Sequence, residues 1–571
     1  MQIAFGILVT LLQLGVFVGL IVLVVKLVSK KGSTSTEGTG VSIRRFFQYL
    51  IMLVMLAIAA FGVIGIVDAA LSTGSAATRD TTAIARSIAF LVVGLPVYGG
   101  LALFTRRQLS KSPAEGQSFG LHAYLTVALI GSLVSAVSFA IAFIGELLAE
   151  GDLDRTALIS MIVWGCVWAA HWRFADRRVE SEKMQLHLLA GSLVGLVPLT
   201  IGAGIAIGAA LGEAYDAVVS ITAVDAGIET LVRGLVLFVV GALVWGFYWL
   251  GRARTAPRSM LWLTYVLLIG VLGGVVTTTV GAGTLIYLIL NWAFGGVGST
   301  SAATHFASIP GAVATLIVGA GAWSYHRWMV GHRSDTARTE VDRVYDYLLS
   351  AAGLVVAAGG LATAITVVLD ALGSEAVIES RGSAGAVAIT LLLVGLPVWW
   401  RHWSRIRRLR AAVPDVEVAS PTRRIYLYLL FGAMSLVAII SLIVLIFLLV
   451  EDLLDGKLGS GTIDDTAVAF SLIVTSGAIA WYHFAVFRED RSIVPAAEAP
   501  ILREIVFVGG DADAAAISAA VEARVTRLRA VGDPVDSATI DDLVETLEMT
   551  GHERVVVIAE GGRFAVIPLD R

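Results

Sequence analysis

The sequence predicts an all-α polytopic membrane protein of 13 transmembrane helices, with a small α/β soluble domain at its carboxyl end. Apolar residues make up 57% of the 571 residues and charged residues only 15%. The mean hydropathy is +0.83, which leaves too little polar surface to cover a soluble globule. Thirteen segments are long enough to cross a hydrocarbon core, which needs roughly 20 apolar residues. A Trp/His motif also recurs at a nearly constant spacing, which indicates repeated helix pairs.

The repeated motif reads apolar-Trp-x-x-His-Trp and closes every second apolar segment. Its first Trp position falls at residues 98, 168, 245, 323, 399 and 480, so successive copies lie 70, 77, 78, 76 and 81 residues apart. A fixed period of this length indicates duplicated supersecondary units. The first copy, which has Tyr98 at this position, is the most degenerate. The motif residues are Trp168, His171, Trp172, Trp245, Tyr248, Trp249, Trp323, His326, Trp399, His402, Trp403, Trp481 and His483.

Six helix pairs are expected after an amino-terminal transmembrane anchor. We interpret residues 1–31 as a retained anchor, because their basic residues follow the apolar run, whereas those of a cleaved signal peptide precede it. The Gly/Ser/Thr-rich residues 32–40 read as a flexible linker. The pairs are expected at 41–118, 119–183, 184–258, 259–338, 339–415 and 416–491. Residues 492–500 are expected to form a hinge to a cytosolic α/β domain at 501–571.

The two helices of each pair have distinct ends. The first helix opens with aromatic residues, as in Arg45-Phe46-Phe47-Gln48-Tyr49, and the second closes with the Trp/His motif. The far end of each first helix carries an acidic or amide residue, namely Asp68, Glu146, Glu213, Asn291, Asp370 and Asp452. These residues fit solvated helix ends, and they also fit a surface that attracts cations or a basic partner.

The distribution of basic residues predicts the orientation in the membrane. One set of loops holds 28 of the 41 Lys and Arg residues, the opposite set holds six, and the tail holds seven. Because basic loops stay in the cytoplasm, the amino terminus is expected outside and the tail inside.

The tail reads as a β-α-β-α-β-β module. Strands are expected at Ile505–Val508 and near 524–531, and a hairpin is expected around Glu560-Gly561-Gly562. The tail contains seven Arg and thirteen Asp or Glu, a net charge of -6, which argues against a nucleic-acid partner.

Two patterns suggest chemistry, and each has a structural explanation. The motif histidines are able to ligate haem or bind a quinone, yet an aromatic belt at the membrane interface accounts for the motif without a cofactor. No cofactor is therefore predicted. Residues 279–283 (Thr-Val-Gly-Ala-Gly) resemble a potassium-channel filter. Residues 200–204 nearly repeat the string, however, and close packing of small residues explains both.

Ionisable residues within the predicted spans are few. Glu229 and Arg233 lie four residues apart on one helix face, where they fit a structural salt bridge or part of an ion or proton relay.

Gly509-Gly510-Asp511 lacks the Lys-Ser/Thr of a phosphate loop and reads as a helix cap. The lone Cys166 excludes an intrachain disulfide. No catalytic or metal-binding constellation stands out, so no enzyme activity is predicted.

The openings and closings of the pairs resemble a known family. The Arg-x-aromatic-x-Tyr-Leu opening, the Gly-Leu-Pro-Val approach to the motif and the Trp-x-x-His-Trp close are similar to the repeated bacterial membrane domain of unknown function 5671. The resemblance covers about residues 41–490 and fades in the third and fourth pairs, where His187 and Trp262 replace the Tyr-containing opening. It implies tandem helix pairs in a bacterial cytoplasmic (inner) membrane. It implies no established activity.

The leading hypothesis from the sequence is a non-enzymatic membrane scaffold or partner-binding protein with a cytosolic docking or sensing tail. A transporter or channel for a small solute is the alternative, and a membrane receptor that signals to the tail is the third hypothesis. The expected partners are the lipid bilayer and other subunits of a membrane complex, with no nucleic acid. The sequence leaves the oligomeric state open.

Overall fold

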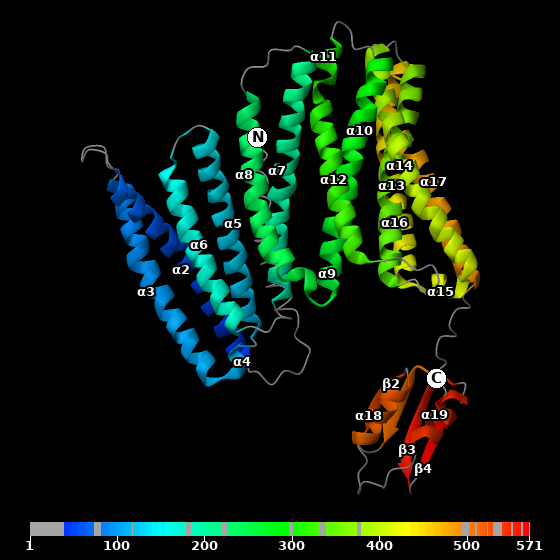
Figure 1. Cartoon of the computed structure of the whole chain (residues 1–571). Coiled ribbons are helices and arrows are strands. Elements are labelled where there is room, and N and C mark those ends of the chain that lie inside the picture. The colour runs from blue at the N-terminus through cyan, green and yellow to red at the C-terminus, as the bar shows by residue number, and fades with distance from the viewer. Residues whose placement is uncertain are drawn as a thin grey trace. The chain divides into compact units, whose positions relative to one another are not determined.

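A computed structural model of the chain (Figure 1) describes residues 39–569, apart from 73–80, 117, 150, 152, 179–183, 220–225, 296–300, 332–338, 374–377, 494–501, 509–510, 522, 529–539, 550–551 and 561–562. Within these ranges twelve helices are long and apolar enough to cross a membrane. The thirteenth predicted span, in residues 1–31, lies outside the described residues. The chain is thus a polytopic helical protein with a small sheet at its carboxyl end.

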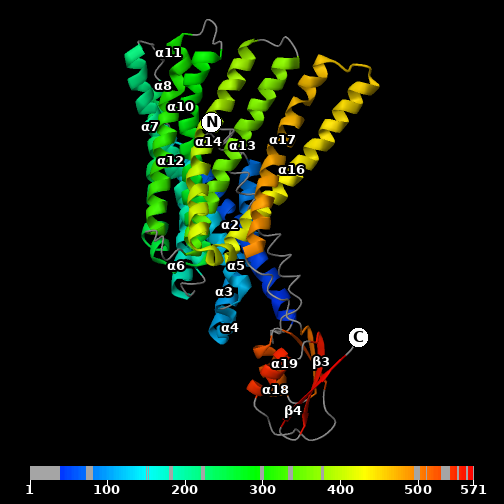
Figure 2. The ribbon, with the colours of Figure 1, turned by 90° about the vertical axis from the view of Figure 1, so that its right-hand side faces the viewer.

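The long helices form six antiparallel pairs. These are α2 (Thr39–Leu71) with α3 (Thr81–Lys111), α5 (Phe119–Ala149) with α6 (Arg155–Arg178), α7 (Gln185–Val219) with α8 (Ala226–Trp245), α10 (Gly273–Phe294) with α12 (Ile309–Val330), α13 (Glu340–Gly373) with α14 (Ile378–Ala412), and α16 (Pro421–Leu454) with α17 (Ser460–Ile493). Figures 1 and 2 both show α16 and α17 side by side. The aromatic rings of Tyr428 on α16 and Phe487 on α17 are in contact. Short helices connect some of them: α4 (Pro113–Gly116), α9 (Met260–Thr264), α11 (Ala302–His305) and α15 (Pro414–Ala419).

Glycines set the close approach of the helices within a pair. A Cβ atom at Gly195 would overlap the backbone of Trp245, and one at Gly353 would overlap the backbone of Trp399. Small residues at such crossings let two backbones pack directly against each other, which favours association of helices in lipid. The small-residue strings of the sequence therefore serve helix packing here.

The third and fourth pairs contain two π-helical segments, Gly246–Leu250 and Tyr265–Leu272. The first continues α8 through the Trp/His motif, and the second joins α9 to α10. A π-helical turn is less regular than an α-helical one and often marks a position where side chains must be re-aimed. Both segments place aromatic residues of the motif region against the neighbouring pair.

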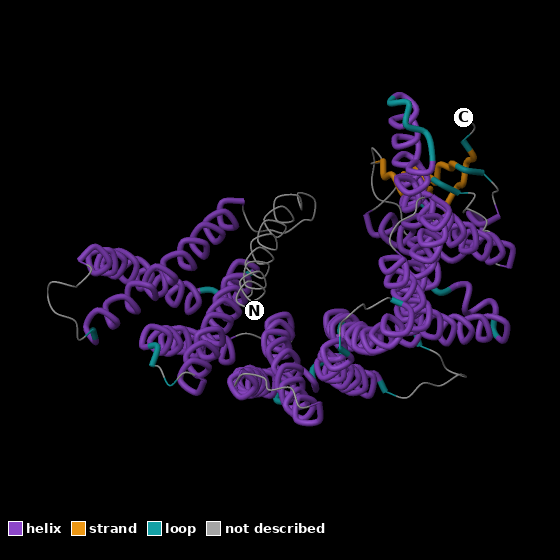
Figure 3. The backbone as a smooth tube through the Cα atoms, turned by 90° about the horizontal axis from the view of Figure 1, so that it is seen from above, coloured by secondary structure: helices purple, strands orange, loops and turns teal. Residues whose placement is uncertain are grey.

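By their contacts the residues divide into two compact units, 1–402 with 452–471, and 403–451 with 472–571. Within the first unit, consecutive pairs pack together: α2 contacts α5 and α6, α5 contacts α7 and α8, and α7 contacts α12. Figure 3 views these helices from above. The pairs therefore associate in the order in which the chain makes them.

The tail contains the only strands among the described residues, drawn in orange in Figure 3. Its elements are β1 (Glu504–Val508), α18 (Asp511–Ala520), β2 (Arg524–Leu528), α19 (Ile540–Met549), β3 (Arg554–Glu560) and β4 (Arg563–Pro568). The strand order is β2-β1-β3-β4, with β1 parallel to β2 and β3, and β4 antiparallel to β3. Ile505 and Phe507 are fully buried, and the residues between them are not, as expected for a strand with one face toward a core.

Candidate functional site

The Trp/His motif of the second helix meets the aromatic opening of the first helix in most pairs. The two lie near the same end of antiparallel helices, so the ring of an opening tyrosine faces the ring of the motif histidine. Ring centroids are 5.7 Å apart for Tyr124 and His171, 5.9 Å for Tyr265 and His326, and 5.8 Å each for Tyr345 with His402 and for Tyr426 with His483. We refer to these as the Tyr/His contacts.

The third pair makes the same contact with its residues exchanged. His187 lies in the opening of the first helix and Tyr248 lies at the histidine position of the motif, with centroids 5.3 Å apart. Each residue looked like a departure from the pattern when its helix was read alone. Together they preserve the Tyr/His contact.

The motif histidines of the second, fourth and sixth pairs share one hydrogen-bonding arrangement. The Nδ1 atom lies 2.8 Å from the main-chain carbonyl four residues earlier, as in His171 with Val167, His326 with Ala322 and His483 with Ile479. Since a carbonyl only accepts, Nδ1 carries the proton and Nε2 is left as an acceptor. Nε2 of His171 lies 2.8 Å from the Tyr124 hydroxyl. Nε2 of His326 and of His483 is buried without a hydrogen-bond partner in the part of the chain that the structure describes.

The fifth pair differs, because a carboxylate takes the place of that carbonyl. His402 Nδ1 lies 3.1 Å from Oδ1 of Asp346, which is fully buried. Asp346 belongs to the opening of α13, one residue from Tyr345, whose ring faces the same histidine. This buried pair was not predicted from the sequence, and the only indication of it was a carboxylate inside an aromatic opening.

Hydrogen bonds between aromatic side chains join consecutive pairs, and we call this set the aromatic ladder. An indole N–H donates to a tyrosine hydroxyl of the next pair in most of them. The bonds are Trp168 to Tyr248 (2.7 Å), Trp245 to Tyr265 (3.2 Å), Trp249 to Tyr325 (2.8 Å), Trp323 to Tyr345 (3.3 Å) and Trp403 to Tyr482 (2.8 Å), with a hydroxyl-to-hydroxyl bond between Tyr98 and Tyr124 (3.3 Å). The motif therefore connects repeats as well as closing them.

The predicted motif residues fall into buried and exposed groups. Trp249 and Trp403 are at most 1% exposed, whereas Trp481 is 74% exposed. Trp172 is intermediate and packs on Phe247, with centroids 5.0 Å apart. Buried indoles of the ladder hold helices together. The membrane-interface role expected for the motif stays a prediction, and it suits the exposed members best.

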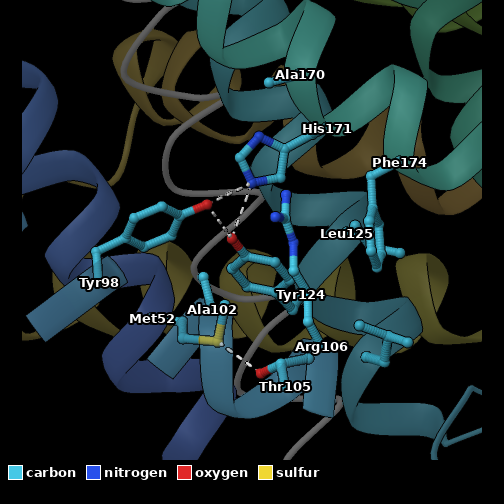
Figure 4. A pocket seen from close by; sticks show the side chains of 11 residues that line it. Met52, Tyr98, Ala102, Thr105, Arg106, Tyr124, Leu125, Ala170, His171 and Phe174 are labelled. Atoms are coloured by element: carbon cyan, nitrogen blue, oxygen red, sulfur yellow. Dashed lines mark hydrogen bonds between the residues drawn. The ribbon is translucent and has the colours of Figure 1, made fainter. Parts of the chain in front are cut away.

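A pocket of about 110 Å³ lies between the first and second pairs (Figure 4). Tyr98 from α3, Tyr124 from α5 and His171 from α6 point toward one another on one side of it. The Tyr98 hydroxyl is 3.3 Å both from the Tyr124 hydroxyl and from His171 Nε2. The rest of the lining is Met52, Ala102, Thr105, Arg106, Leu121, Leu125, Ala170 and Phe174. The ladder thus borders a pocket at its amino-terminal end.

Charged residues pair near the helix openings. Arg45 donates to Glu115 at 2.9 Å, and Arg423 donates to both oxygens of Asp490 at 2.6 and 3.0 Å. The predicted contact between Glu229 and Arg233 is present at 2.8 Å, with both side chains partly exposed. Such an exposed pair contributes little to stability. Within the described residues, no group of three or more His, Cys, Asp or Glu side chains comes together as metal ligands would.

Comparison with known proteins indicates a repeating unit of two helix pairs. No curated protein and no solved structure matches the chain. The family described as domain of unknown function (DUF5671) matches residues 45–166, 185–321 and 343–482. Each match begins in an odd-numbered pair and extends through most of the next pair. The histidines with the same main-chain hydrogen bond likewise recur in every second pair, after 155 and 157 residues. The chain therefore belongs to the DUF5671 family and carries three matches to its domain in tandem.

Proposed function

We propose that the protein is a non-enzymatic membrane scaffold that binds other membrane proteins, with the tail as a cytosolic docking or sensing module. The aromatic ladder is the observation that carries this proposal. Its hydrogen bonds cross the interfaces between pairs, and each contributes about 0.5–1.5 kcal/mol when its partners are buried. An array joined in this way suits a protein that holds its helices in fixed positions.

The apolar faces of the helices supply the binding surface of the proposal. On α16, the side chains of Leu436, Ile443 and Phe447 are about 60% exposed, at 58%, 63% and 62%. In a membrane such a face contacts either lipid or another protein. We further propose that the protein lies in a bacterial cytoplasmic membrane with its amino terminus outside. The distribution of basic residues supports this orientation.

A transporter or channel remains the second candidate and is favoured by the twelve described spans. Alternating access requires helix groups that move against one another. The ladder bonds lie at the interfaces between pairs, which such a movement would open, whereas the glycine contacts described above hold together the two helices of one pair. A receptor signalling to the tail is the third candidate, and it needs a ligand on the acidic outer loops.

A photocrosslinking experiment on α16 tests the scaffold. A photoreactive residue at Phe447, which is exposed, is compared with one at Ser441, which is 6% exposed on the same helix. The scaffold predicts a discrete protein adduct of constant stoichiometry at 447 and none at 441. Lipid adducts alone at 447, together with solute uptake by liposomes containing only this protein, would refute the scaffold and support transport.

A further inference from the structure

The pocket between the first and second pairs combines hydrogen-bond donors, a cation and apolar walls. It is built by four helices of two pairs: α2 contributes Met52, α3 contributes residues that include Tyr98 and Arg106, and α5 and α6 supply the rest of the wall. Its volume of about 110 Å³ leaves room for a group several times the size of a water molecule.

The hydrogen bonds determine which polar groups of the pocket donate and which accept. His171 Nδ1 is committed to the Val167 carbonyl, so Nε2 accepts, and the Tyr124 hydroxyl at 2.8 Å donates to it. Tyr98 lies 3.3 Å from both of these groups, a long contact for a hydroxyl. A better acceptor in the pocket would therefore accept a hydrogen bond from the Tyr98 hydroxyl. The Tyr98 hydroxyl is therefore available as a hydrogen-bond donor, and we expect the ligand to carry an acceptor.

Arg106 gives the pocket its charge. Figure 4 shows its side chain extending past Tyr124 toward His171. Arg44 and Arg45 of the same pair share the single carboxylate of Glu115, whereas Arg106, whose side chain is exposed, makes no ion pair among the residues that the structure describes. The lining includes no carboxylate. An uncompensated guanidinium beside a hydroxyl donor favours an anionic oxygen ligand.

The surroundings indicate where that anion comes from. Arg106 lies at the end of α3 predicted to face the cytoplasm, where phospholipid headgroups lie. The lining has an apolar part, which includes Leu121 and Phe174. The helix α3, which supplies Arg106, also carries exposed apolar side chains, with Leu95 at 53% and Leu103 at 57% exposed. A headgroup in the pocket would leave its acyl chains along that helix.

We propose that this pocket binds a phosphodiester anion, supplied by the headgroup of an anionic phospholipid. Arg106 would neutralise the phosphate, and the Tyr98 hydroxyl would donate to one of its oxygens. The Tyr124 hydroxyl keeps its hydrogen bond to His171, which leaves the Tyr98 hydroxyl free to donate to the ligand. This site is independent of the scaffold proposal, because a transporter or a receptor would bind the same lipid.

Native mass spectrometry of the full-length protein, loaded with defined mixtures of phosphatidylglycerol and phosphatidylcholine, tests the site. Arg106→Gln is expected to weaken phosphatidylglycerol retention by roughly ten- to a hundredfold, the loss that follows from removing a charge-assisted hydrogen bond. The matched control is Arg107→Gln, which removes the same charge from an equally exposed neighbour outside the lining and is expected to leave retention within about threefold. Equal losses in the two variants would overturn the proposal.

Two further arms identify the ligand. Ala102→Phe fills the pocket without changing its charge, so it is expected to lose phosphatidylglycerol as Arg106→Gln does, and it replaces that variant if the latter fails to fold. Excess inorganic phosphate is expected to leave the lipid bound. Displacement of the lipid by inorganic phosphate would show a soluble anion to be the ligand, and retention of a quinone that is indifferent to Arg106→Gln would show a neutral one. Either result would overturn the lipid assignment.

Discussion

The second and third helix pairs build the same contact from opposite helices. In the second pair the tyrosine, Tyr124, lies on the first helix and His171 lies on the second. In the third pair His187 lies on the first helix and Tyr248 on the second. Ring centroids remain within 5.3–5.7 Å in both. The packing of the two rings therefore does not depend on which helix supplies which residue.

The two pairs also keep their tyrosine hydroxyl bonded to the preceding pair. Tyr98 bonds to Tyr124, and Trp168 donates to Tyr248. The histidines of the two pairs differ in their hydrogen bonds. Both ring nitrogens of His171 are hydrogen-bonded, whereas neither nitrogen of His187 has a partner among the described residues. The comparison indicates that the repeats preserve the hydroxyl that continues the ladder, whereas the hydrogen bonds of the imidazole differ from pair to pair.

Reversing the exchange in the third pair should give the largest effect. Tyr248→His alone removes the hydroxyl that accepts from Trp168 and leaves a partly buried N–H without that partner, so we expect a loss of about 1–3 kcal/mol. Adding His187→Tyr returns a hydroxyl to the first helix, as in the second pair. The double variant should be more stable than the sum of the single changes by about 0.5–3 kcal/mol, measured by reversible unfolding in detergent.

The control for this cycle is Leu186→Tyr, which places the same side chain one position away, where the residue is 52% exposed. Combined with Tyr248→His, it should show no coupling. Additive effects in the His187 cycle itself would mean that the exchange is accidental and that the two positions are not alternative sites for one hydroxyl.

The same comparison shows what the sequence could reveal. The motif spacing and the run of apolar segments were enough to predict six helix pairs, and the four-residue spacing was enough to predict the Glu229–Arg233 contact. Both predictions depend only on the spacing of residues along the chain. The relation of His187 to Tyr248 joins different helices, so each residue alone looked like a lost motif position.

Trp481 shows a similar limit within a single helix. Its indole stands one residue after the first Trp position of the motif, and one residue corresponds to about 100° around an α-helix. That rotation turns the side chain outward, where it is 74% exposed. Ala480 occupies the buried position instead. The pocket could not be predicted either, because it needs four helices of two pairs.

Replacing each histidine by phenylalanine sharpens the contrast between the second and third pairs. His171→Phe deprives Tyr124 of its acceptor, so we expect it to cost about 1–2 kcal/mol. His187→Phe removes two buried nitrogens that have no partner among the described residues, so we expect it to be neutral or slightly stabilising. Unfolding midpoints of the two variants in one detergent provide the measurement. Equal destabilisation would show that ring packing, rather than hydrogen bonding, determines the role of both histidines.

The smallest predicted effect separates two bonds of the ladder by their length. Tyr248→Phe and Tyr265→Phe delete the same atom and keep the same ring, but their hydroxyls lie 2.7 Å and 3.2 Å from the indole nitrogens of Trp168 and Trp245. The shorter bond should be the stronger, so Tyr248→Phe should cost about 0.5 kcal/mol more within the range known for helix contacts in membranes. If Tyr265→Phe costs as much, then the stability of the ladder comes from its stacked rings, and the hydroxyls serve to set the register between pairs.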